Sequence, residues 1–116
     1  MKKQEFISLV RDAINNFEIQ GKFSRDVAGG CFYNNNGCRC IVGWMMPNDV
    51  ATLADKQIES GILDLAADGF EWTKQFNKEQ IDVLNGLQGY HDHSQDVADA
   101  VAKMKHVIED YERYAE

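Results

Sequence analysis

The last part of the chain places its apolar residues at the spacing of an α-helix, and this pattern restricts the fold more than any other feature. After Ser94 the apolar positions step by four, three, four and three residues: Val97, Val101, Met104, Ile108 and Tyr111. This spacing puts all of them on one face of a helix, for which Ser94 is a suitable N-cap. A helix with one apolar face needs other elements to cover it. We therefore expect a mainly α-helical fold.

Earlier segments supply those elements. Residues 3–18 carry a second apolar face with polar residues opposite it. Residues 49–59 and 78–90 follow the same helical pattern, the latter after a capping-box sequence. The stretch 61–76 is interrupted by glycine and predicts a short helical turn and a loop. The chain thus predicts about four or five helices.

The segment between the first two helices is rich in turn residues. An Asn-Asn-Asn-Gly sequence at 34–37 separates two short runs with β propensity, so we expect a small β-hairpin over residues 31–40. The run at 41–46 that follows is too apolar for a surface position and ends at Pro47. We expect this run to form the centre of the core.

Length and composition bound the class of protein. A chain of 116 residues makes one domain over residues 1–116, and 44% hydrophobic with 27% charged residues is typical of a globular protein. The longest apolar run is far shorter than the roughly 20 residues of a membrane span, and no apolar signal core follows the basic N-terminus. Three cysteines within ten residues are a poor disulfide framework and favour a reducing compartment. We therefore expect a cytoplasmic location.

The net charge is −7 and is unevenly distributed. Residues 1–58 contain seven Lys and Arg against six Asp and Glu, whereas residues 59–116 contain five against thirteen. Negative charge repels phosphate backbones and anionic lipids, so we expect neither direct nucleic-acid binding nor membrane binding. The acidic C-terminal half is either a solvated helix face or a docking surface for a basic protein.

Cysteine and histidine residues suggest two kinds of chemistry. Cys40 is a candidate nucleophile, with His91 as its base and Asp92 as the orienting carboxylate. By residue type Cys38, Cys40, His91 and His93 are candidate zinc ligands, although Cys-x-Cys is tighter than the usual Cys-x-x-Cys pair. The alternative for the same residues is structural, with cysteines in the core and histidines at a polar helix end. We expect no catalytic site, bound metal or cofactor.

Two other groups of residues suggest binding. Phe70 and Trp72 lie in a glycine-containing loop that cannot bury both rings against one face, which makes Trp72 a candidate anchor for a partner. An oligomer that sequesters a signalling nucleotide would need to gather cationic side chains around a phosphate. The candidates are Arg11, Lys22, Arg25 and Arg39.

Two short motifs lie within residues 31–93. The first is Arg39-Cys40-Ile41-Val42-Gly43 followed by Met46-Pro47, and the second is Leu87-Gln88 followed by His91-Asp92. In these motifs the chain resembles small uncharacterised proteins of phages and bacterial mobile elements. The resemblance implies a phage-type origin without a particular activity, and it implies that Cys40, His91 and Asp92 belong to one site.

Together these observations predict a function without catalysis. By analogy with small acidic phage proteins, we expect the chain to bind and inhibit a host protein with a basic surface, as an anti-defence factor would. A thiol or zinc site at Cys40 and an oligomeric nucleotide sponge are the alternatives, and the sequence leaves open whether the chain is a monomer or a dimer. The predicted contact surface consists of Phe70, Trp72, Asp99, Glu109 and Glu112.

Overall fold

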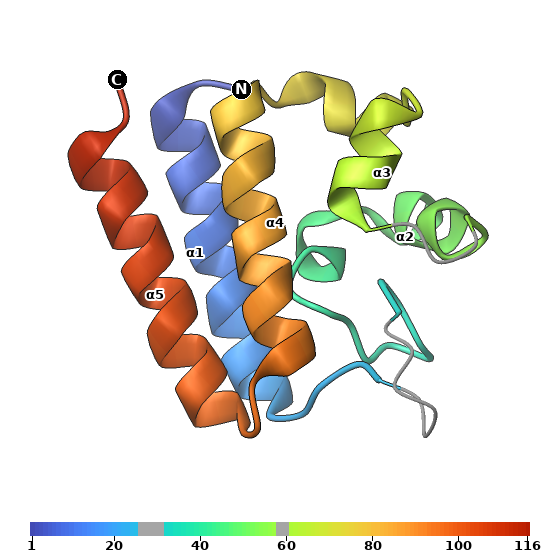
Figure 1. The fold of residues 1–116 in the computed structure, drawn as a ribbon. Helices are drawn as coiled ribbons and strands as arrows, with labels where there is room; N and C mark the ends of the chain where they lie inside the picture. Colours follow the sequence, from blue (N-terminus) through green and yellow to red (C-terminus); the bar gives the residue numbers. More distant parts are fainter. Residues whose placement is uncertain (26–31, 58–60) are drawn as a thin grey trace.

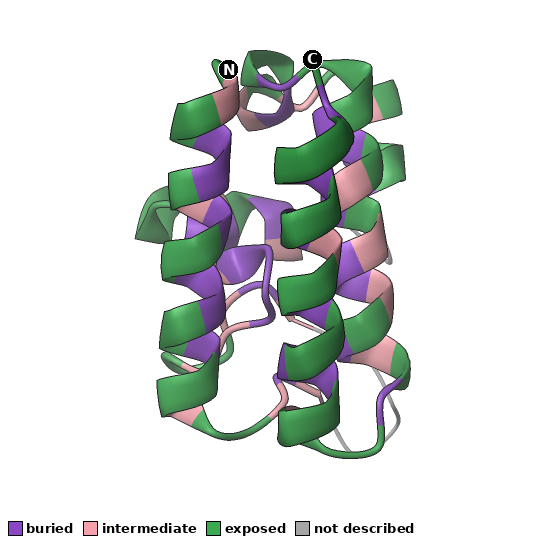
Figure 2. Ribbon diagram, turned by 90° about the vertical axis from the view of Figure 1, so that its left-hand side faces the viewer, coloured by how far each residue is buried: buried purple, intermediate pink, exposed green. Residues whose placement is uncertain are grey.

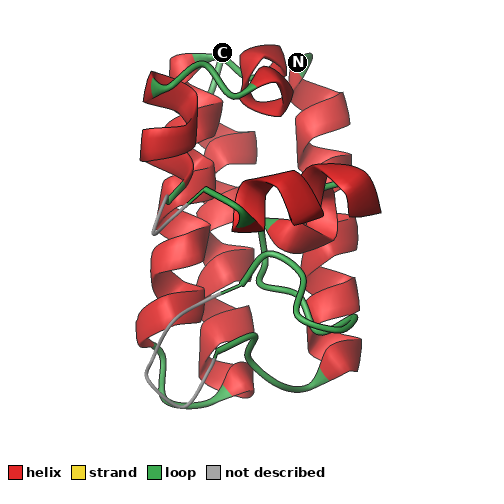
Figure 3. Cartoon of the chain, turned by 90° about the vertical axis from the view of Figure 1, so that its right-hand side faces the viewer, coloured by secondary structure: helices red, strands yellow, loops and turns green. Residues whose placement is uncertain are grey.

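Three long helices lie side by side (Figure 1). α1 (Lys3–Gln20) and α4 (Lys78–His93) run in the same direction, and α5 (Val97–Tyr114) returns antiparallel to them. This computed structural model describes residues 1–25, 32–57 and 61–116. The mainly α-helical fold predicted from the sequence is confirmed. Shorter elements connect α1 to α4 (Figure 3): η1 (Gly43–Met45), α2 (Asn48–Asp55), α3 (Ile62–Ala67) and η2 (Glu71–Gln75).

The long helices bury the faces that their sequence patterns predict. Figure 2 shows buried residues along the inner sides of α1 and α5 and exposed residues along their outer sides. Burial of these faces is what holds the helices, because isolated helices of this length are only marginally stable in water. No described helix is both long enough and apolar enough to cross a membrane.

Local hydrogen bonds set the helix ends. Gly21 adopts a φ of 71°, and its N–H bonds to the carbonyl of Phe17 at 3.1 Å, which ends α1. α4 begins with the predicted capping box. Asn77 Oδ1 accepts from the N–H of Gln80 at 2.8 Å, and Gln80 Oε1 accepts from the N–H of Asn77 at 3.0 Å.

The predicted cap of the last helix is wrong. Its N-cap is Asp96, whose Oδ1 accepts from the N–H of Asp99 at 2.7 Å. Ser94 instead ends α4, because its own N–H bonds to the carbonyl of Tyr90 at 3.1 Å. α4 runs past the predicted end at residue 90 to His93. The connection to α5 is therefore short, and Asp96 directly precedes the first residue of α5.

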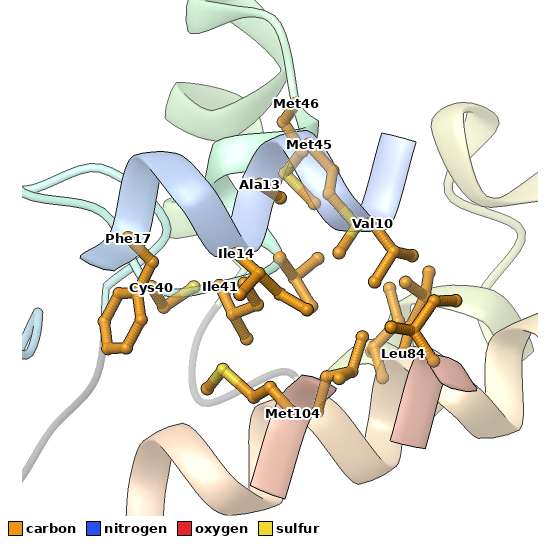
Figure 4. Close-up of a cluster of buried hydrophobic side chains, with 14 of the residues drawn as sticks. Val10, Ala13, Ile14, Phe17, Cys40, Ile41, Met45, Met46, Leu84 and Met104 are labelled. Carbon is orange, nitrogen blue, oxygen red and sulfur yellow. The ribbon is translucent and has the colours of Figure 1, made fainter. Parts of the chain in front are cut away.

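The apolar run at 41–46 lies in the core, as predicted. Ile41 and Val42 are fully buried, and Met45 and Met46 are nearly so. Figure 4 shows this segment against α1, with Met104 of α5 in the same cluster. The run thus joins the side chains of the long helices into one core.

The predicted β-hairpin at 31–40 is wrong for the described residues, which contain no strand. They contain a single antiparallel bridge between Asn35 and Cys38. The expected tight turn is present, with φ of 53° at Asn36 and 87° at Gly37. Cys31, at the start of the predicted hairpin, lies outside the described residues.

Side chains of neighbouring helices bind several backbone donors of this segment. The carboxylate of Asp55 in α2 accepts from the N–H of Tyr33 at 2.7 Å and from the N–H of Asn34 at 2.9 Å. Gln20 Oε1 at the end of α1 accepts from the N–H of Arg39 at 2.9 Å. One further backbone bond joins the two arms, from the N–H of Cys40 to the carbonyl of Phe32 at 3.3 Å. The segment is therefore held partly by its own backbone and partly by helix side chains.

Gly43 is the position at which this loop approaches itself most closely. A Cβ added there would lie 1.9 Å from the carbonyl oxygen of Tyr33, a backbone atom that cannot move aside. Gly43 is also buried at the start of η1. Any side chain at this position would push the 32–35 segment away from the apolar run.

We predict that Gly43→Ala lowers the free energy of unfolding by about 3 kcal/mol or more, because the new methyl group overlaps backbone. Gly86→Ala is the matched control. A Cβ at Gly86 meets nothing within 4 Å, and alanine favours a helix interior by about 1 kcal/mol over glycine. Urea denaturation should therefore show opposite signs for the two substitutions, and a mild effect of Gly43→Ala would contradict the close approach.

Candidate functional site

The two motifs that carried the resemblance lie on different elements. Cys40 and Gly43 belong to the loop between α1 and α2, whereas His91 and Asp92 end α4. Both motifs pack against the last turns of α1, where the ring of Phe17 lies 5.5 Å from the ring of His91. The structure therefore shows what each motif residue contacts.

Cys40 is a buried thiol bonded to its own loop. Its side chain is 1% exposed, and Sγ accepts from the N–H of Gly43 at 3.3 Å. Burial raises the pKa of the Cys40 thiol to about 12. A thiol in this state is protonated at neutral pH, which is opposite to what a nucleophile needs.

Arg39 forms hydrogen bonds to the same loop. Its guanidinium donates to the carbonyls of Gly43 at 3.3 Å and Met46 at 3.1 Å, and it lies over the ring of Trp44. Trp44 Nε1 in turn donates to Gln20 Oε1 at 3.0 Å. The Arg-Cys-x-x-Gly motif therefore has a structural role. Its arginine binds two backbone carbonyls, its thiol binds an N–H, and its glycine allows the close approach to the carbonyl of Tyr33.

His91 is fully buried, and both of its ring nitrogens are occupied. Nε2 accepts from the backbone N–H of Ser24 at 3.2 Å, so this nitrogen carries no proton. Nδ1 must then carry it, and it donates to Asp92 Oδ1 at 2.9 Å. Asp92 also accepts from Gln88 Nε2 at 2.9 Å. The second motif therefore ties the chain at Ser24 to the end of α4.

Arg25 adds a cation at the end of α4. Its guanidinium donates to the carbonyl of His91 and, at 3.2 Å, to that of Ser94, and it stacks 3.9 Å from the centre of the Phe23 ring. A cation there complements the negative end of the helix dipole. Arg25 Nε and Gln88 Oε1 are buried without a hydrogen-bond partner among the described residues, so the network is not fully satisfied.

The candidate catalytic residues are only partly brought together. His91 and Asp92 are hydrogen-bonded, but neither ring nitrogen of His91 is left to take a proton from Cys40. The candidate zinc ligands are dispersed: Cys38 Sγ lies 3.6 Å from the carbonyl of Phe23, and His93 is exposed. Within the described ranges, no three His, Cys, Asp or Glu residues are grouped so that they could hold a metal ion.

The candidate phosphate ligands are used elsewhere. Arg25 and Arg39 donate to backbone carbonyls of different segments, and Arg11 pairs with Glu112 of α5. Lys22 is exposed beside Gly21. The structure therefore does not gather the four cations around one position.

The predicted contact residues do not form one surface. Phe70 and Trp72 are partly buried at η2, and Trp72 packs edge-on against Phe76 at 4.9 Å. Asp99 and Glu112 lie in the first and last turns of α5, about 140° apart around the helix at 100° per residue. Contacts with a partner at all these positions would need a partner that wraps around the molecule.

Several residues that build this region carry no motif in the sequence. Ser24 contributes only its backbone N–H, which every residue type except proline has. Asp55 binds residues 33 and 34, more than twenty positions earlier in the chain, so the spacing of residues in the sequence points to neither contact. Leu53 and Leu63 are exposed apolar residues on the short helices α2 and α3, at 51% and 47% exposure. Their helical periodicity gave no reason to expect them at the surface.

Comparison of the chain with protein-family models, with curated proteins and with solved structures finds no match. What the chain does must therefore be argued from its own residues.

We predict that His91 occurs as the Nδ1–H tautomer. Two-bond ¹H–¹⁵N correlation spectra should show one protonated and one unprotonated ring nitrogen, with the protonated one assigned to Nδ1. His93 and His106 are exposed, and their signals serve for comparison. An Nε2–H tautomer for His91 would contradict its bond to Ser24.

The buried thiol also predicts a loss of stability in alkali. The pKa of Cys40 is raised from 9.0 to about 12, so above about pH 9 the unfolded state ionises while the folded state does not. Stability from this group is full below about pH 9 and is lost as the pH rises toward 12. Burial raises the pKa of Tyr33 in the same way. Urea titrations across this range should show a shallower decline for Cys40→Ala, and equal slopes would contradict the burial of Cys40.

Proposed function

We propose that this chain is a non-enzymatic binding protein of phage or mobile-element type, which acts in the bacterial cytoplasm by binding and inhibiting a basic host protein. One observation carries the proposal: the side chains suited to chemistry, Cys40 and His91, are buried and bonded to the protein's own backbone. Residues in that state hold the fold. The surface is then the part of the molecule that remains to act, and its C-terminal half is acidic.

The contact surface is best placed where α3 meets η2. We define this acidic corner as Leu63, Asp64, Asp68, Trp72 and Glu79. α3 contacts both η2 and α4, so these residues belong to neighbouring elements. The three carboxylates are exposed, and none of them takes part in an ion pair among the described residues. The half-buried indole and the exposed leucine add apolar contact area beside them.

Asp99 and Glu112, two of the predicted contact residues on α5, are less suited to bind a basic partner. Asp99 already pairs with Lys103 at 2.9 Å, and Glu112 pairs with Arg11 at 3.0 Å. A cation of the same chain already neutralises part of the charge of each of these carboxylates, so their attraction for a uniformly basic surface is weaker. Unpaired carboxylates attract such a surface with their full charge, and they raise the association rate in a salt-dependent way.

We predict that Asp64→Lys combined with Asp68→Lys weakens partner binding by about tenfold or more. Immobilised wild-type chain should retain a basic protein from a bacterial lysate, and its association rate should fall between about 0.05 M and about 0.5 M salt. The matched control is Asp12→Lys with Asp110→Lys, which changes the net charge equally at exposed positions of α1 and α5.

Circular dichroism would show that both double variants fold. A partner that binds the corner variant as tightly as the wild type would refute the acidic corner as its docking surface. Failure of the wild type to retain any protein would refute the proposed function itself.

A further inference from the structure

A groove of about 280 Å³ lies between α1 and α5. These two helices lie on the side of the molecule away from α3 (Figure 1). Ile14 and Ile108 line it and are themselves 2% and 1% exposed, so they form its floor. Charged side chains form the rim: Arg11, Glu18, Lys105 and Glu109. The groove is therefore apolar at its base and charged along its edges.

The charges on the two helices follow the same spacing. On α1 the cation Arg11 precedes the anion Glu18 by seven residues, and on α5 Lys105 precedes Glu112 by seven. Seven residues of helix span about 10 Å. Because α1 and α5 run antiparallel, Arg11 lies beside Glu112 at 3.0 Å, and Lys105 lies beside Glu18 at 3.8 Å.

These four residues, Arg11, Glu18, Lys105 and Glu112, form a square of alternating charge that we call the charge square. Each is about half exposed, with side-chain exposures between 42% and 54%. Each intramolecular pair therefore leaves part of its charge toward solvent. That residual charge is available to a second molecule.

The charge square is complementary to itself. Two copies of one surface meet face to face in a closed dimer through a twofold axis in the plane of contact. An axis parallel to the helices places α1 against α5 of the second copy, and an axis across them exchanges the two ends of the groove. In either case each cation of the square faces an anion of the second copy.

We infer that a second copy of this chain docks on the α1–α5 groove. The aliphatic stems of Arg11 and Lys105 cover the isoleucine floor while their charged ends pair across the interface. Each intramolecular ion pair becomes part of a four-charge network. α3, which carries Leu63 and Asp64 of the acidic corner, lies away from α1 and α5 (Figure 1), so these residues stay accessible in such a dimer.

Sedimentation velocity over a range of protein concentrations tests this inference. We expect a reversible dimer whose dissociation constant rises about tenfold between about 0.05 M and about 0.5 M salt. Arg11→Glu should raise the dissociation constant further, because it places like charges against each other. Lys78→Glu makes the same change in net charge at an exposed position of α4 and should leave dimerisation unchanged. Thermal unfolding followed by circular dichroism would show that both variants fold, and Lys105→Glu provides a second disruption of the square.

Exchanging Arg11 and Glu112 distinguishes the two possible orientations of the twofold axis. The double variant Arg11→Glu with Glu112→Arg makes the α1 side anionic and the α5 side cationic. This variant should dimerise if α1 packs against α5 of the second copy, because opposite charges then face each other. It should stay monomeric if α1 packs against α1, because two anionic helices then face each other. A wild-type chain that stays monomeric at all concentrations overturns the inference, as does a dimer that Arg11→Glu and Lys78→Glu affect equally.

Discussion

Insertion of the apolar segment 41–46 between the long helices and the short ones is the constraint on which the rest of the structure depends. This segment has almost no polar side chains of its own, so its backbone groups need partners from elsewhere. Arg39 supplies donors to two of its carbonyls, and the Cys40 thiol accepts from an N–H. Gly43 makes the insertion sterically possible, because only a residue without a side chain fits against the carbonyl of Tyr33.

The motif residues are therefore explained by the fold. Cysteine, histidine and aspartate near one another suggest catalysis, and the same residue types serve here to fasten a long connection to α1 and α4. His91 shows the difference most clearly. A histidine that acts as a base needs a free lone pair, and the lone pair of His91 is taken by the N–H of Ser24. A buried histidine whose lone pair is bound by the protein's own backbone serves the fold.

Sequence patterns predicted the helices and the core because those features depend on neighbours three or four residues apart. The capping box at Asn77 and the glycine at the end of α1 were predictable for the same reason. The conformation of the 32–40 segment was not predictable, because the N–H groups of Tyr33, Asn34 and Arg39 bind Asp55 and Gln20, which are distant in sequence. The contacts of the candidate site were not predictable either. The Arg39 and Cys40 bonds are local and were still missed, since no sequence pattern distinguishes a cysteine that accepts an N–H from one that reacts.

The pairing of α1 with α5 joins the two ends of the chain, and it has a consequence for how the protein folds during synthesis. Contacts such as that between Arg11 and Glu112 span about a hundred residues, and contacts of this separation form late. While the ribosome is still translating, α1 has no α5 to cover its apolar face. The nascent chain therefore leaves the part of that face that α5 covers exposed until α5 has been made, and in this interval it is open to aggregation or to a chaperone.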